Sequence, residues 1–215
     1  MFEYVYDLSG CAYPVMENFD IADATAITKG ELVRFTDGYI VAGGTDYTTP
    51  YTGVAAESKA ANDGKLRIKV YVSPTAVFKV DPIVTTVTAT PSTTVWTDST
   101  ILLNTTADIA NGGKLKIKGK ASGATGTFLV GKVIPVVDSA TNTLTGAAAS
   151  FPGSTTVGDS AYFFPAINKL GATASATNGL TLTWAATSGT ALRVVDHDLD
   201  NNKVLVQIKL HSFAN

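Results

Sequence analysis

Residues 65–72 read KLRIKVYV, with an apolar side chain at every second position. The apolar set, which shares one face of an extended chain, comprises Leu66, Ile68, Val70 and Val72. This period of two predicts a β-strand with one buried and one solvent-exposed face. The segment AVFKV at 76–80 continues the same pattern.

Two predicted hairpins lie on either side of this strand. In the first, ELVRF at 31–35 and YIVA at 39–42 flank Asp37-Gly38, a pair that accepts the positive φ angles of a tight turn. In the second, ALRVVD and KVLVQIKL enclose the polar loop HDLDNN at 197–202 and close the chain.

The remaining sequence keeps the β character. Charged residues make up only 16% of the 215 residues, and residues 83–107 are rich in threonine without a helical period. We therefore predict an all-β protein, either an antiparallel β-sandwich or a small β-barrel, with an extended N-terminal arm. An arrangement in two β lobes is an alternative. The expected divisions are an arm over 1–20, a β domain over 21–82, a Thr-rich insertion or second lobe over 83–180, and a closing hairpin over 181–215.

Charge and composition argue against several classes of partner. The net charge is −2, and lysines alternate with apolar residues, so we expect no nucleic-acid partner. No apolar run reaches the roughly 20 residues that span a bilayer, so we expect no membrane partner. The single cysteine, Cys11, rules out an intrachain disulfide, and the acidic N-terminal segment does not read as a secretory signal.

Residues suited to catalysis are few. The two histidines, His197 and His211, are expected to be structural or solvated, with a pKa near the usual value of about 6.5. A set of alternating acids resembles the opening of a calcium loop and comprises Asp196, Asp198 and Asp200. Asn201 replaces the glycine of such a loop, so a solvated turn is favoured and weak calcium binding is the lesser alternative. We expect no catalytic residue, no cofactor and no metal, and a protein that is not an enzyme.

Aromatic side chains offer a contact surface instead. The candidates for contact with other subunits are Phe2, Tyr4, Tyr6, Tyr13, Tyr47 and Tyr51. An alternative is stacking on sugar rings by Trp96, Trp184, Tyr162, Tyr47 and Tyr51. Burial in the core or contact between subunits is the favoured interpretation of these rings.

Three stretches resemble known phage head proteins. TKGELVRFTDGYIVAGG at 28–44 and YTGVAAESKAANDGKLRIKVYVSPTAVFKV at 51–80 resemble the small β domain of tailed-bacteriophage head decoration (cement) proteins. LRVVDHDLDNNKVLVQIKL at 192–210 resembles the closing hairpin of phage auxiliary capsid proteins. The Thr-rich middle has no counterpart in this resemblance, which covers about half of the chain.

The resemblance implies a structural virion protein. Such a subunit, often a homotrimer, is added to the outside of the capsid, where it binds the major capsid protein and stabilises the shell. Such a subunit is made in the host cytoplasm. The resemblance implies no catalytic residues. The alternative function is a phage head-fibre or tail-associated module that binds carbohydrate or the host.

Overall fold

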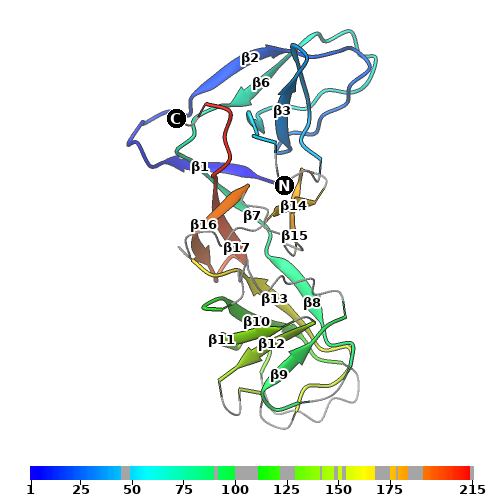
Figure 1. Ribbon diagram of the computed structural model, residues 1–215, viewed down its shortest axis with the longest axis vertical. Coiled ribbons are helices and arrows are strands. Elements are labelled where there is room, and N and C mark those ends of the chain that lie inside the picture. The colour runs from blue at the N-terminus through cyan, green and yellow to red at the C-terminus, as the bar shows by residue number, and fades with distance from the viewer. Residues whose placement is uncertain are drawn as a thin grey trace.

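The structure, a computed structural model, describes residues 1–44, 49–89, 92–99, 111–121, 129–140, 142–147, 150–151, 154–167, 175–177, 179–183 and 191–213. These residues form strands, turns and loops and contain no helix. All pairings between the labelled strands are antiparallel. The all-β prediction is confirmed, and Figure 1 shows two lobes joined by a central sheet.

The first lobe is a five-stranded antiparallel sheet. Its strands, in spatial order, are β2 (Met16–Asp20), β6 (Arg67–Tyr71), β5 (Gly53–Ala55), β3 (Leu32–Thr36) and β4 (Tyr39–Ala42). The turn between β3 and β4 has positive φ at Asp37 and Gly38, 50° and 88°, which confirms the predicted hairpin. Ile68 and Val70 of β6 are fully buried as expected, whereas Leu66 precedes the strand and is 59% exposed.

The central sheet has four strands. Their order is β1 (Glu3–Asp7), β7 (Ala76–Val80), β17 (Lys203–Ile208) and β16 (Leu192–Asp198). β16 and β17 form the predicted closing hairpin. β7 is buried along almost its whole length because it is an inner strand between the lobes.

The second lobe is a six-stranded sheet at the other end of the molecule (Figure 1). Its strands, in spatial order, are β8 (Ile83–Thr86), β13 (Ser160–Phe164), β10 (Lys114–Gly119), β11 (Val133–Ala140), β12 (Thr143–Gly146) and β9 (Val95–Thr97). The lobe begins at residue 83, where a Thr-rich insertion or second lobe is expected. Its core is continuous with that of the central sheet.

A small hairpin crosses one of the expected divisions. β14 (Ser175–Thr177) pairs with β15 (Thr181–Thr183), so a boundary between residues 180 and 181 would cut this hairpin. Gly179 in its turn accepts a hydrogen bond from the Leu32 N–H at 2.7 Å. The turn therefore contacts the first lobe and belongs neither to the six-stranded sheet nor to the closing hairpin.

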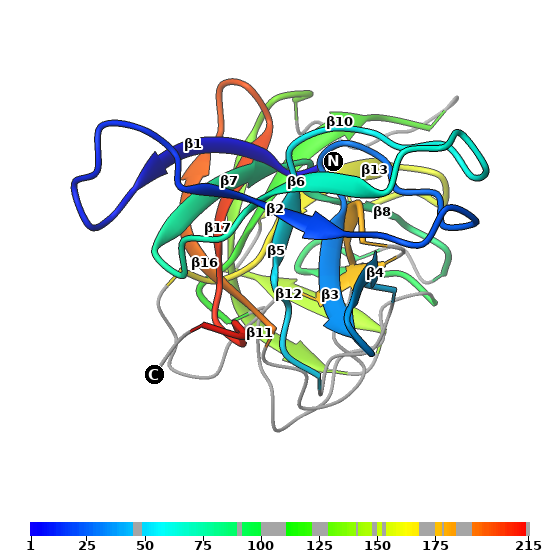
Figure 2. The ribbon, with the colours of Figure 1, turned by 90° about the horizontal axis from the view of Figure 1, so that it is seen from above.

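The N-terminal segment is extended but does not form a separate arm. β1 pairs with β7, and β2 pairs with β6, so residues 1–20 contribute a strand to each of two sheets (Figure 2). The expectation of an arm over 1–20 is corrected accordingly. Alternating aromatic side chains indicate an extended conformation, but they do not tell which chain supplies the neighbouring strand.

Gly53 permits a close approach between two strands. A Cβ atom at this position would lie 1.9 Å from the Tyr71 carbonyl oxygen. No side chain fits that space, so glycine is required where β5 meets the end of β6. This contact places Tyr71 beside β5 and helps to shape the region described next.

Candidate functional site

Exposed apolar side chains concentrate at the N-terminus. Among the described residues, seventeen large apolar side chains are exposed, and seven of them lie within the first sixteen positions. These seven are Met1, Val5, Tyr6, Leu8, Tyr13, Val15 and Met16. Three of the seven, Leu8, Tyr13 and Val15, share one loop, and exposed apolar side chains gathered in one place are typical of a surface that contacts another protein.

We call the loop that carries these three side chains, residues 8–15, the projection. It connects β1 to β2 and extends beyond the sheets in Figures 1 and 2. Its sequence, LSGCAYPV, contains no charged residue, and Tyr13 at its end is 83% exposed. The free energy of desolvation is small for an uncharged loop when a partner covers it.

A buried carboxylate anchors the base of the projection. Asp7 is 6% exposed, and its Oδ1 accepts hydrogen bonds from the Ser9 N–H at 2.9 Å, the Ser9 hydroxyl at 2.6 Å and the Thr75 hydroxyl at 2.5 Å. Gly10 adds a main-chain hydrogen bond to the Asp7 carbonyl at 3.2 Å. These bonds hold the first turn of the projection together and tie its base to Thr75, the residue before β7, which reduces the entropy lost on binding.

Burial of Asp7 would raise the pKa of its carboxyl group. Hydrogen bonds from Ser73, Ser9 and Thr75 outweigh that effect and lower the pKa to about 2. The folded state therefore binds this proton more weakly than the unfolded state. The stabilisation is complete above pH 4 and is lost as the pH falls through about 2.

Asp7→Asn is expected to reduce the free energy of unfolding at pH 7 by about 2 kcal/mol, because the hydrogen bonds to an ionised acceptor are lost. The difference between wild type and variant should shrink between pH 4 and pH 2, as measured by urea unfolding. Asp37→Asn, at an exposed turn, is the control and should change the stability little at any pH. A pH-independent difference between Asp7→Asn and wild type would contradict this account.

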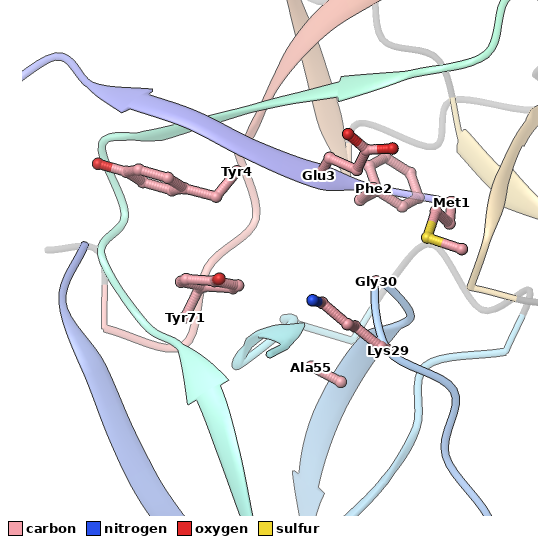
Figure 3. Close-up of a pocket in the computed structure, with 8 residues that line it drawn as sticks. All are labelled: Met1, Phe2, Glu3, Tyr4, Lys29, Gly30, Ala55 and Tyr71. Atoms are coloured by element: carbon pink, nitrogen blue, oxygen red, sulfur yellow. The ribbon is translucent and has the colours of Figure 1, made fainter. Parts of the chain in front are cut away.

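A groove of about 360 Å³ lies beside β1 (Figure 3). It is lined by Met1, Phe2, Glu3, Tyr4, Lys29, Gly30, Ala55 and Tyr71. The rings of Tyr4 and Tyr71 stack with centroids 5.4 Å apart, and both rings pack edge-on against Phe78. The Phe2 N–H donates to the Gly30 carbonyl at 2.9 Å, which joins β1 to the first lobe at this position.

The two charged residues of the groove differ in their partners. The Glu3 carboxylate lies 3.0 Å from the Lys79 ammonium group, and its hydrogen bond to Lys79 lowers the pKa of Glu3. The Lys29 side chain points into the groove in Figure 3, and its ammonium group makes no hydrogen bond or ion pair with the described residues. Within the part of the chain that the structure describes, Lys29 is therefore a positive side chain without a polar partner, and it lies beside the aromatic walls of the groove.

Comparisons with known proteins were made at the level of families, curated sequences and solved structures. None of the three finds a match for this chain.

The sequence-predicted contact residues fall into three groups. Tyr6 is 39% exposed and Tyr13 is 83% exposed, so both lie on the surface, whereas Tyr4 is half-buried in the groove wall. Phe2 and Tyr51 are 2% and 0% exposed and belong to the core, which corrects their assignment as contact residues. Tyr47 lies outside the described residues.

Tyr51 is held in the core by contacts with segments distant in sequence. Its main chain pairs with Leu210 and Ser212, and the Arg34 guanidinium lies 5.2 Å from its ring centroid. Sequence reasoning missed Leu8, Val15 and Lys29. The uncharged run after a strongly alternating strand was the available signal for the first two, whereas the position of Lys29 depends on the tertiary fold.

The described aromatic residues considered for sugar binding present little exposed ring face on which a sugar could stack. Trp96 is fully buried, and its indole N–H donates to the Thr85 hydroxyl at 3.0 Å. Tyr162 is half-buried, with the Lys118 ammonium 5.4 Å from its ring centroid. Trp184 lies outside the described residues.

Both histidines differ from the expectation of an ordinary pKa. Burial lowers the pKa of His211 to about 4, and its Nδ1 accepts a hydrogen bond from the Phe213 N–H at 3.1 Å. Burial also lowers the pKa of His197. The His197 Nε2 atom lies 2.6 Å from the Pro165 carbonyl oxygen. Each ring is held by one main-chain hydrogen bond. Among the contacts of the described residues, neither ring nitrogen is hydrogen-bonded to a carboxylate of the kind that orients a catalytic histidine.

The alternating acids of the C-terminal turn bind local groups. Asp198 accepts hydrogen bonds from the Asn201 N–H at 3.1 Å and side-chain amide at 2.8 Å, and Asp196 accepts one from the His197 N–H at 2.7 Å. Asp200 is exposed in the turn. Within the described ranges, no three His, Cys, Asp or Glu residues are grouped to hold a metal ion. The same part of the chain contains no helix able to cross a membrane.

Proposed function

We propose that this protein is a structural virion protein, a capsid decoration (cement) subunit that binds the outside of the major capsid protein shell and stabilises it. The observation that carries the proposal is the projection: an exposed, uncharged apolar loop whose base is fixed by Asp7. The resemblance of residues 28–80 to phage decoration proteins supports the choice of partner. On this proposal the protein is not an enzyme, and it acts as a homotrimer on the capsid exterior.

The physical basis of such a role is rigid docking repeated over many copies. A loop that is already ordered loses little conformational entropy on binding, so its apolar contacts contribute more of their free energy to affinity. Several subunits attached to one shell also raise each other's effective concentration. Weak individual contacts are therefore sufficient to hold neighbouring capsid proteins together.

The double variant Leu8→Ser with Tyr13→Ser is expected to weaken binding to undecorated capsids about tenfold or more, because truncating central contact residues costs about 1 kcal/mol or more each. Binding is measured by co-sedimentation with purified shells. The matched control is Leu129→Ser with Val130→Ser, two residues of the second lobe that are 74% and 61% exposed.

The control variant should bind as wild type does, and thermal unfolding should show both variants folded. If the wild-type protein binds shells of the matching phage in no maturation state, the proposed function is wrong. If both double variants lose affinity equally, the projection is not the docking site.

A further inference from the structure

We propose that the groove beside β1 receives a short extended segment of the partner protein, which adds as a strand to the free edge of β1 and places a carboxylate beside Lys29. Assignment of this segment to the capsid shell rests on the proposed function. Binding of an extended acidic segment by the groove does not, and it can be tested separately.

Beyond the Phe2–Gly30 bond, no described strand pairs with β1 on the groove side. β1 is the end strand of the central sheet, with β7 on its other side. The Phe2 N–H donates to Gly30, away from β7, and alternate residues of a strand direct their main-chain groups to the same side. The main-chain groups of Tyr4 therefore point toward the groove, where an added strand would find its hydrogen-bonding partners.

The walls of the groove select the side chains of that strand. Tyr4 and Tyr71 form a stacked aromatic surface, and Ala55 leaves space opposite them. An apolar or aromatic side chain fits against these rings. Lys29 supplies a positive charge that no described residue neutralises, so the complementary group is a carboxylate.

The dimensions favour an extended segment over the edge of a folded sheet. β1 is five residues long and its groove-side edge is already bonded to Gly30 at Phe2, so only a few residues of a partner can pair with it. A groove of about 360 Å³ accommodates the few side chains of such a segment. The packed sheet edge of a second copy would bring further strands against the walls of the first lobe.

The test uses a displayed library of random seven-residue peptides selected on the immobilised full-length protein. We expect enriched peptides to carry an aspartate or glutamate and an aromatic or large aliphatic residue at alternating spacing. A synthetic copy of the best peptide should bind Lys29→Glu about tenfold or more weakly, because an attractive charge pair becomes repulsive. Lys118→Glu, an exposed lysine on β10 in the other lobe, is the matched control and should bind as wild type does.

Main-chain pairing is tested with a peptide in which a central residue is replaced by proline. Because proline lacks an N–H, this peptide should lose most of its affinity for the protein. Amide chemical shifts should move at residues 2–6, 29–30, 55 and 71. Absence of enrichment, equal binding to Lys29→Glu and Lys118→Glu, or shifts confined to other surfaces would overturn the proposal. Self-association of the protein that is abolished by Lys29→Glu would assign the groove to a second copy, and it would also overturn the proposal.

The two proposals fail in different ways. If Lys29→Glu binds shells as wild type does and the library shows no enrichment, the groove proposal is wrong and the decoration function stands. A selected peptide that binds the groove, together with no binding to any shell, would remove the decoration function while leaving the groove as a peptide site.

Discussion

Lys59→Met is expected to lower the free energy of unfolding by about 3 kcal/mol, because it removes one partner of a buried ion pair. The Lys59 side chain is fully buried in the first lobe, and its ammonium group donates to three main-chain carbonyls. These belong to Asp23 at 2.7 Å, Thr25 at 3.2 Å and Ala60 at 3.0 Å. The Asp63 and Asp23 carboxylates lie 3.1 Å and 3.6 Å away.

Methionine keeps the length and apolar character of the lysine stem, so the loss reports on the ammonium group. Without it, converging carbonyl and carboxylate oxygens lose their shared donor. The value is placed at the lower end of the usual range for broken buried pairs because the carboxylates of Asp23 and Asp63 are partly exposed.

The control is Lys65→Met, which removes an ion pair to Glu57 with a 3.0 Å separation on the surface. Its cost should stay below about 1 kcal/mol, the usual range for exposed pairs. Urea unfolding at neutral pH measures both variants. Equal losses in the two would show that Lys59 does not organise the loops around it.

Trp96→Ala is the second large effect, with an expected loss of about 4 kcal/mol from a cavity in the core of the second lobe. Trp96 is fully buried, and its ring packs against Phe151 with centroids 5.8 Å apart. Its N–H donates to the Thr85 hydroxyl, which in turn donates to the Asp98 carboxylate at 2.7 Å. The substitution therefore creates a void and also removes the donor to a buried hydroxyl.

Trp96→Phe separates these two contributions. It keeps most of the ring volume but loses the hydrogen bond, so the expected loss is about 1–2 kcal/mol. Thermal and urea unfolding measure the series. A stable Trp96→Ala variant with altered binding to sugars would contradict the buried position and revive a role for this ring in recognition.

Local patterns were sufficient to predict some of the strands. Alternation at 65–72, the Asp37-Gly38 turn and the closing hairpin depend on neighbours in the sequence, and all three are found in the structure. A period of two identifies the buried face of a strand, and a two-residue turn sets its register. These features need no knowledge of distant residues.

The partners of each strand were decided by the tertiary structure. β1 pairs with β7 and β2 with β6, although residues 1–20 read from the sequence as an arm for a neighbouring subunit. An edge strand offers the same hydrogen bonds to its own chain as to another. The choice depends on which long-range pairing buries more apolar surface, and Phe2 is buried by this one.

The candidate site shows the same division. The uncharged run at 8–15 can be read from the sequence, whereas the core position of Tyr51 and the lack of a polar partner for the Lys29 ammonium among the described residues cannot. Residue type and spacing determine which side chains alternate along a strand. Burial and charge pairing are set by segments distant in sequence, since the main chain of Tyr51 pairs with that of Leu210 and β1 forms one wall of the groove beside Lys29.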